Sequence, residues 1–126
     1  MYEHDYIMRL IKEIIRVILK LLLGIDTESP TTELLRHTEE AEVNHLLKMI
    51  DEGKINCAEK RVYQLIGEEG KEGLKKALLF YSYLNDKSDE FLEENGFSRE
   101  EVMLGIERIA DGLGIGEMVK TVLFLD

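Results

Sequence analysis

The sequence predicts an all-α fold of about six or seven helices. Glu, Lys, Leu and Ile are abundant and the 126 residues include one proline, a composition that favours helices. Apolar residues recur at helical spacing along most of the chain, and no long stretch alternates with the period of two that a strand requires. The length fits a single domain, residues 1–126, with an N-terminal helix in residues 1–24 and a helical bundle in residues 30–126.

The first helix is predicted from the long apolar run between Tyr6 and Leu23, which Gly24 ends. Its charged residues would form one narrow polar stripe: Arg9, Lys12, Glu13, Arg16 and Lys20. So many charges make a transmembrane helix unfavourable. A helix that is apolar over most of its circumference is typical of a segment packed against protein, and its basic residues leave a membrane surface as the alternative.

We expect protein to cover this helix on two sides, and one of those sides to belong to a second copy of the chain. A small bundle can cover the centre of the apolar face and one flank. The other flank would then be an exposed apolar strip, which usually indicates an interface. The sequence therefore predicts a two-fold homodimer. The residues expected at the self-association interface are Met8, Ile11, Ile15, Ile18, Leu19 and Leu22.

The second predicted helix begins where Ser29 and Pro30 resemble an N-cap followed by a first-turn proline. Polar residues crowd between residues 38 and 42 and could interrupt it. Gly53 is expected to end this helix.

A third helix is predicted after Asn56, because Asn56 and Glu59 resemble a capping box. Its inward residues would include Ala58, Val62 and Leu65. The Gly-rich stretch at residues 67–73 is expected to be a turn. A fourth helix follows, with one apolar face formed by Leu74, Ala77, Leu78, Tyr81 and Leu84.

The last part of the sequence predicts three further helical segments. The first is short and lies around residues 89–95. Ser98 and Glu101 form the clearest capping box in the chain and open a longer helix that Gly112 ends. Residues 117–124 are expected to form a final short helix that packs Met118, Val122 and Leu123 inward.

The charge of the chain restricts its partners. A formal net charge of −10 opposes nucleic-acid binding, which depends on Lys and Arg contacts to phosphates. Residues 25–126 carry 12 Lys and Arg against 23 Asp and Glu, so a groove between the middle helices should favour basic or neutral peptides. Cys57 is the single cysteine, and the residues before the apolar run lack the cations of a secretory signal. We therefore expect a cytoplasmic protein.

The candidate chemical motifs are incomplete. Glu42 and His45 form an E-x-x-H pair, which on a helix could supply half of a dinuclear iron site. The second half is missing, because neither His4 nor His37 follows a Glu at the required spacing. Cys57 has no neighbouring base that would activate it as a nucleophile. We expect no catalytic residue, no metal site and no cofactor, and hence no enzymatic activity.

Residues 51–65, DEGKINCAEKRVYQL, resemble the second half of a tetratricopeptide repeat (TPR). Gly53 stands at a helix end, and the inward positions carry the small and apolar residues that the repeat uses. The resemblance implies TPR-like antiparallel helical hairpins over roughly residues 42–110.

The stretches EHDYIMRLIKEI (residues 3–14) and ALLFYSYLNDKSDEFLEENGFSREEV (residues 77–102) together resemble a family of small, uncharacterised bacterial proteins. This resemblance covers most of the chain and implies no assigned activity. The sequence therefore favours a non-catalytic protein–protein interaction module that self-associates through its N-terminal helix. The alternative is a peripheral membrane protein anchored by that same amphipathic helix.

Overall fold

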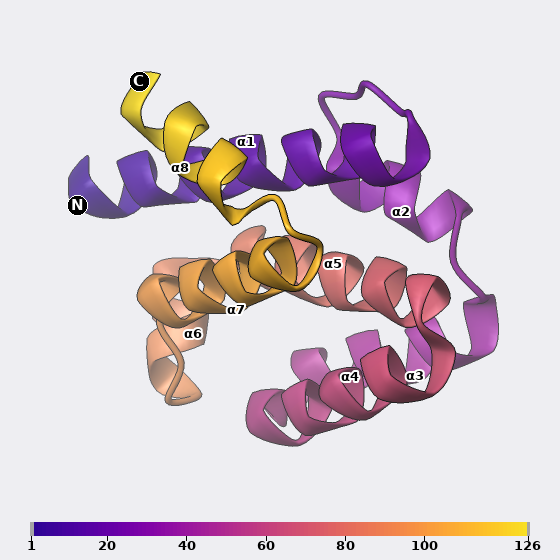
Figure 1. Cartoon of the computed structure of the whole chain (residues 1–126). Helices are drawn as coiled ribbons and strands as arrows, with labels where there is room; N and C mark the ends of the chain where they lie inside the picture. Colours follow the sequence, from indigo (N-terminus) through magenta and orange to yellow (C-terminus); the bar gives the residue numbers. More distant parts are fainter. Residues whose placement is uncertain (1, 126) are drawn as a thin grey trace.

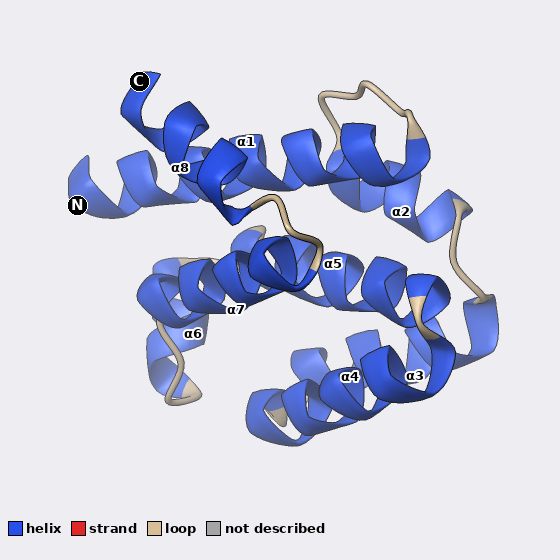
Figure 2. Ribbon diagram, in the orientation of Figure 1, coloured by secondary structure: helices blue, strands red, loops and turns tan. Residues whose placement is uncertain are grey.

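The computed structural model describes residues 2–125, with the side chains of residues 5–121, and this range consists of helices joined by short turns (Figure 2). It contains no strand, so the all-α prediction is confirmed. The described range forms eight helices: α1 (Tyr2–Leu23), α2 (Pro30–Arg36), α3 (Glu40–Asp51), α4 (Ile55–Glu69), α5 (Lys71–Asn85), α6 (Asp89–Glu94), α7 (Arg99–Gly112) and α8 (Gly116–Leu125). The predicted number of six or seven is therefore too low.

The second predicted helix is divided into α2 and α3, which explains the difference in number. Pro30 occupies the first turn of α2 as predicted, but the side chain of Ser29 makes no capping hydrogen bond. At the other end, the Thr38 hydroxyl donates to the carbonyl oxygen of Leu34 at 2.8 Å. Hydroxyl side chains that bond to the backbone in this way compete with helix continuation.

Helix α5 is the centre of the fold. In Figure 1 it runs between α1 and α2 on one side and α3 and α4 on the other, and α7 packs against it. Ten of its 15 residues are buried. The predicted apolar face is one part of this surface, because Leu79 and Phe80 outside that face are buried as well. A helix that is buried on most sides must be enclosed by other elements.

The turn between α4 and α5 is shorter than the predicted turn at residues 67–73. Gly70 alone joins the two helices, with φ 59°, a conformation that favours glycine. Gly73 is helical, and a Cβ at this position would lie 2.2 Å from the carbonyl oxygen of Leu65. The glycine therefore allows α4 and α5, which run in opposite directions (Figure 1), to approach closely.

The start of α4 also differs from the prediction. The helix begins at Ile55, and its N-cap residue Lys54 makes no side-chain capping hydrogen bond, so the predicted capping box at Asn56 is wrong. The side chain of Glu59 instead accepts a hydrogen bond from the Tyr81 hydroxyl at 2.7 Å. The inward residues of α4 are buried as predicted: Ala58, Val62 and Leu65.

The predicted start of α7 is confirmed. Ser98 is its N-cap, and the Ser98 Oγ accepts a hydrogen bond from the backbone N–H of Glu101 at 3.1 Å. This bond satisfies one of the backbone donors that the first turn of a helix leaves free.

Arg99, the first residue of α7, is buried and connects three elements. Its Nε donates to Asp89 at 3.0 Å, and its Nη1 donates to the carbonyl oxygen of Asn85 at 2.6 Å. Its Nη2 donates to the carbonyl oxygen of Lys87. The guanidinium thus satisfies carbonyl groups at the C-terminal end of α5 that have no partner within that helix.

Helix α8 contacts α1 and α7, so that the two ends of the chain lie at the same end of the molecule (Figure 1). Val119 is its buried residue among those described, whereas Met118, which was predicted to face inward, is 48% exposed. The register of the helix therefore differs from the prediction. The predicted contacts of Val122 and Leu123 lie outside the described side chains.

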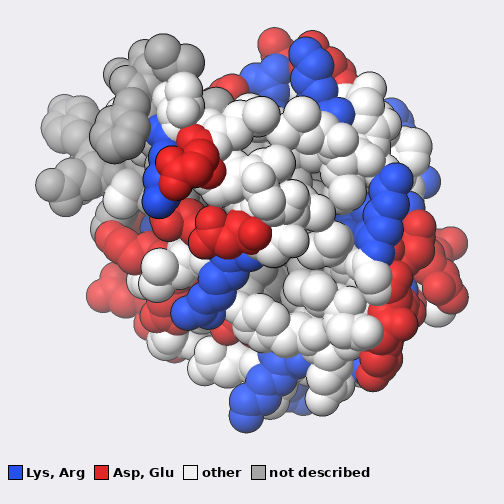
Figure 3. All heavy atoms as spheres, viewed as in Figure 1, with Lys and Arg blue, Asp and Glu red and all other residues white. Residues whose placement is uncertain are grey.

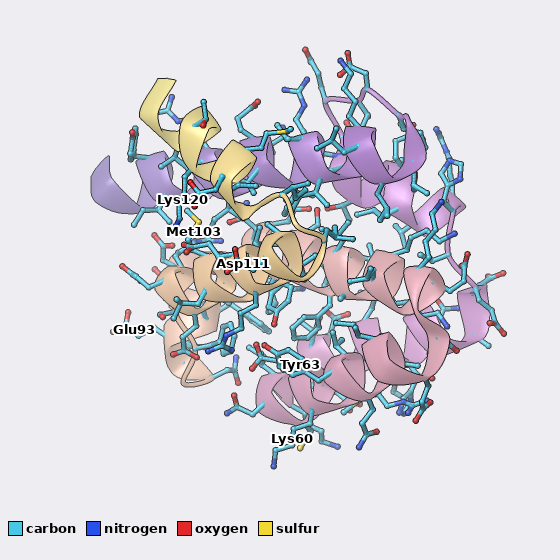
Figure 4. All side chains as sticks on the ribbon, viewed as in Figure 1. Lys60, Tyr63, Glu93, Met103, Asp111 and Lys120 are labelled. Carbon is cyan, nitrogen blue, oxygen red and sulfur yellow. The ribbon has the colours of Figure 1, made fainter. Side chains whose placement is uncertain are left out.

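Tyr81 and Gly105 bring α5 and α7 together. The Tyr81 side chain is buried, and a Cβ added to Gly105 would lie 2.2 Å from its Cζ atom. On the same side of the molecule Arg108 donates to the Tyr63 hydroxyl at 3.0 Å, and Tyr63 projects from α4 toward α7 (Figure 4). The Tyr81 ring therefore lies between α5 and α7, and its hydroxyl reaches Glu59 on α4.

We predict that Gly105→Ala destabilises the protein by about 1–3 kcal/mol, because the rigid Tyr81 ring must move to make room for the methyl group. Gly67→Ala is the matched control. Gly67 is also helical but has no neighbour within 4 Å of an added Cβ, so its replacement should stabilise the protein by about 0.5–1 kcal/mol. Urea unfolding measures both changes. Equal effects of the two substitutions would contradict the packing role of Gly105.

A second tertiary contact joins α3, α5 and the turn after α5. Asp51 accepts hydrogen bonds from the Tyr83 hydroxyl and from Lys87 Nζ, each at 2.7 Å. The Lys87 ammonium also lies 4.7 Å from the ring centroid of Tyr83 and 5.0 Å from that of Phe91. The hydrogen bond from Lys87 lowers the pKa of the Asp51 carboxyl, and the same bond raises the pKa of the Lys87 ammonium.

The two shifts predict how stability depends on pH. A carboxyl with a lowered pKa contributes stability above its unfolded pKa of about 4 and loses it as the pH falls through the folded value. A lysine with a raised pKa contributes stability below about pH 10.4 and loses it as the pH rises through the folded value. We predict that Asp51→Asn costs about 0.5–1 kcal/mol at pH 7 and much less at pH 3, as measured by urea unfolding.

Glu52→Gln is the control for this prediction, because Glu52 has a longer surface ion pair with Lys54 at 3.6 Å. It should change the free energy of unfolding little at either pH. If Asp51→Asn cost the same at pH 3 as at pH 7, the ion pair would not be the source of the effect.

Candidate functional site

The candidate functional site is the side of α1 that the rest of the bundle leaves uncovered. The fully buried residues of α1 lie on one side of the helix, which faces α5 and α7: Ile11, Ile14, Ile15, Ile18 and Leu19. Helices α2 and α8 contact α1 as well. Among the described helices, none is apolar over a stretch long enough to cross a bilayer.

This burial corrects the predicted self-association interface. Four of the six predicted residues, Ile11, Ile15, Ile18 and Leu19, have no exposed surface, so a second copy cannot reach them. The other two residues, Met8 and Leu22, are partly buried. The prediction fails because helical periodicity identifies two flanks of an apolar helix without showing which flank the bundle covers.

The flank that remains accessible is the opposite one, and we call it the outer flank. It consists of Tyr6, Leu10, Val17 and Leu21, whose spacing places them in one row along a helix. Tyr6 is 46% exposed and Leu21 is 52% exposed, while Leu10 and Val17 are partly buried. Uncharged residues cover much of the centre of the face that Figure 3 shows.

Basic side chains lie next to the outer flank. Arg9, Lys12 and Lys20 are exposed, and within the described residues they form no ion pair. Arg16 differs, because it contacts Glu13 at 3.0 Å and donates to the carbonyl oxygen of Thr27 at 2.6 Å. It thereby holds the connector between α1 and α2. The three free cations, which we call the basic row, are available to an anionic partner.

A surface cavity of about 520 Å³ opens beside the N-terminal half of α1. Its lining combines apolar and charged side chains: Tyr6, Arg9, Leu10, Lys12 and Glu13. It could accept an apolar side chain from a partner while a carboxylate of that partner contacts the basic row. The chemistry of this site is therefore that of binding an amphipathic surface.

The other residues singled out by sequence have local partners or lie apart. Glu42 accepts a hydrogen bond from Arg61 Nη2 at 2.6 Å, whereas His45 is exposed. Cys57 is exposed too. Across the described residues no three His, Cys, Asp or Glu side chains are arranged so that they could hold a metal ion.

The buried hydroxyl of Tyr81 is the polar group that sequence reasoning missed. Burial raises the pKa of Tyr81, and hydrogen bonds with Tyr63 and Glu59 raise it further. The phenol is therefore neutral at physiological pH and donates to Glu59. This group links α4 and α5 and has no cavity next to it among those described. No local pattern in the sequence predicts this group, because Gly105 lies next to Tyr81 only in the folded chain.

Comparison with known proteins adds the family. Residues 1–114 match the model of a family of unknown function, DUF6483. No curated protein and no solved structure matches the chain, so the TPR-like character of the hairpins stays a prediction. The match extends from α1 to the turn after α7, and α8 follows it. Because it covers most of the sequence, the chain belongs to the DUF6483 family, whose function is unknown.

Proposed function

We propose that the chain is a non-catalytic protein interaction module that self-associates through the outer flank of α1. The observation that carries this proposal is the exposure of Tyr6 and Leu21 in one row with Leu10 and Val17, on a helix whose other flank is mostly buried. Exposed apolar rows beside charged residues are typical of interaction sites.

The polar groups inside the fold support a non-catalytic role. Lys76 is buried and contacts Glu69 at 2.7 Å, and the Ser82 hydroxyl lies 2.6 Å from that of Thr31. Asn85 donates to the backbone carbonyl of Met8 at 2.9 Å. Each of these side chains joins two segments of the chain, which is a structural task.

The apolar area alone would give a weak association. Full burial of one such side chain contributes about 1.5–3 kcal/mol, so a half-exposed one contributes roughly half of this. Two copies that each bury Tyr6 and Leu21 would gain about 3–6 kcal/mol, which reaches only the low end of an association cost of about 4–15 kcal/mol. A stable contact therefore also needs the basic row.

A membrane surface is the second candidate, and the basic row favours it because anionic lipids attract Lys and Arg. The outer flank argues for protein instead, because it is one row wide and most of the apolar face of α1 is inside the bundle. Co-sedimentation with vesicles that contain anionic lipid separates the two. Binding that Leu21→Asp abolishes, together with a monomeric protein in solution, would favour the membrane.

We predict that light scattering at high micromolar concentration gives a mass about twice the 14.6 kDa of one chain. Leu21→Asp should give a monomer, because the substitution places a charge within the apolar row of the outer flank. Circular dichroism should show unchanged helicity, since Leu21 is exposed and outside the core.

Leu35→Asp is the matched control for this experiment. Leu35 is an exposed leucine as well, at 43%, but it lies on α2 and is not part of the outer flank. It should leave the mass unchanged. A monomeric wild-type protein at the same concentration, or a Leu21→Asp variant that associates like the wild type, would contradict the proposal.

We also predict that protein purified without chelator carries no stoichiometric iron, manganese or zinc. The reason is that Glu42 is engaged by Arg61 and no second E-x-x-H pair exists in the sequence. Elemental analysis by mass spectrometry measures this. A stoichiometric metal that is lost in His45→Ala would place Glu42 and His45 in a site and would contradict the non-catalytic proposal.

A further inference from the structure

Two groups of exposed charges without an ion-pair partner stand out among the described residues, and they have opposite sign. The first group is the basic row of α1. The second is a set of carboxylates on α6 and the first turn of α7, which we call the acidic end: Glu90, Glu93, Glu94, Glu100 and Glu101. All five are exposed, and within the described residues none of them forms an ion pair. Figure 3 shows acidic side chains gathered on the left of the molecule, where α6 and the start of α7 lie.

Several acidic residues elsewhere form ion pairs with neighbours, and the exposed ones that do not, such as Glu28, Glu40 and Asp111, are spread over different segments. Glu69 contacts Lys76 at 2.7 Å and Glu72 contacts Lys75 at 2.7 Å. Glu42 contacts Arg61 at 2.6 Å. The acidic end is distinguished by the gathering of five such carboxylates within residues 90–101. The cations beside it, Arg99 and Lys87, are engaged by Asp89 and Asp51.

The acidic end also offers apolar surface. A cavity of about 240 Å³ is rimmed by Asp89, Glu93 and Glu100, with Leu92 and Phe97 among its lining residues. Leu104 lies one helical turn after Glu100 on the same side of α7 and is 50% exposed. The surface thus combines exposed apolar atoms with free carboxylates, as the outer flank combines exposed apolar atoms with free cations.

We infer that the occupant of the outer flank is the acidic end of a second copy of this chain. This inference rests on the proposed self-association and names the two surfaces that meet. Leu21 and its row would lie against Leu104 and the 240 Å³ cavity, while the basic row contacts the carboxylates of Glu93 and Glu100. Arg9 and Lys20 are 11 residues apart, about 16 Å along a helix, so they can reach carboxylates on both α6 and α7.

Contact between two outer flanks is the competing arrangement, and charge disfavours it. It would bring the basic rows of both copies together, and the described carboxylates of α1 beside them are exposed Asp5 and Glu13, which contacts Arg16. Like charges that face each other across an interface oppose association. Contact between unlike surfaces removes this repulsion, and it can occur twice in a closed two-fold dimer because each copy carries both surfaces.

Charge reversal tests the inference. The first variant carries Arg9→Glu and Lys20→Glu, and the second carries Glu93→Lys and Glu100→Lys. Each variant alone should associate at least about tenfold more weakly than the wild type in sedimentation velocity, because the reversed group then faces a group of its own sign. An equimolar mixture of the two should recover the wild-type mass, since each reversed surface finds its complement on the other protein.

Two further measurements control the experiment. Glu40→Lys with Glu68→Lys makes the same change in net charge as Glu93→Lys with Glu100→Lys, on exposed positions of α3 and α4, and it should leave the association unchanged. Raising the salt concentration should weaken the wild-type association, because exposed charges are screened. Circular dichroism and thermal unfolding establish that each variant is folded.

The outcomes separate the inference from the proposed function. If the variant with Glu93→Lys and Glu100→Lys associates like the wild type while Leu21→Asp is monomeric, the outer flank still mediates self-association but the acidic end is not its partner. If the wild type is monomeric, both are wrong. If Arg9→Glu with Lys20→Glu abolishes only binding to anionic vesicles, the basic row serves a membrane and the inference is overturned.

Discussion

Helix α5 has five neighbours, α1, α2, α3, α4 and α7, and the burial of its surface by these helices organises the whole molecule. Each neighbour can bury its own apolar side against one common element. The arrangement has a cost, because α5 also takes polar side chains out of water. Lys76, Ser82 and Asn85 are all buried, and each has a partner on another segment. Without these partners the buried groups would destabilise the fold.

Packing around α5 also determines which sides of α1 are buried. Because α1 contributes its isoleucine-rich side to the core around α5 and α7, it has one flank left for other contacts. Its charged stripe is divided in the same way. Arg16 fixes the connector to α2, and the remaining cations have no intramolecular role within the described residues. One helix therefore serves both the core and the surface, and the boundary between the two roles runs along its length.

Local sequence patterns predicted most of the helices but little of how they meet. The apolar run of α1, the single proline and the Ser98 cap each act within a few residues, so they can be read without knowing the fold. The role of Gly73 could not be predicted in this way, because a Cβ at this position would clash with the backbone of Leu65 on a neighbouring helix. This glycine is explained by the close packing of two helices and not by a turn.

The candidate site shows the same difference between what local sequence patterns predict and what depends on contacts between helices. The sequence correctly indicates that α1 is too apolar for full exposure, yet most of the residues it selects for an interface are buried by the bundle, because their exposure depends on how the other helices pack against α1. The acidic end could not be recognised either. Glu93 and Glu100 are unremarkable in an acidic chain, and the structure is needed to show that they are exposed, form no ion pair and rim a cavity.

The buried guanidinium of Arg99 has a consequence for the order in which the molecule opens. If the start of α7 separated from α5, Arg99 would leave the carbonyl groups of Asn85 and Lys87 without their donor, and a buried charge would lose its ligands. Partial opening at this point is therefore costly, and the segment from the end of α5 to the start of α7 is expected to unfold as one cooperative unit. The acidic end belongs to this unit, so its carboxylates keep a fixed spacing as long as Arg99 remains in place.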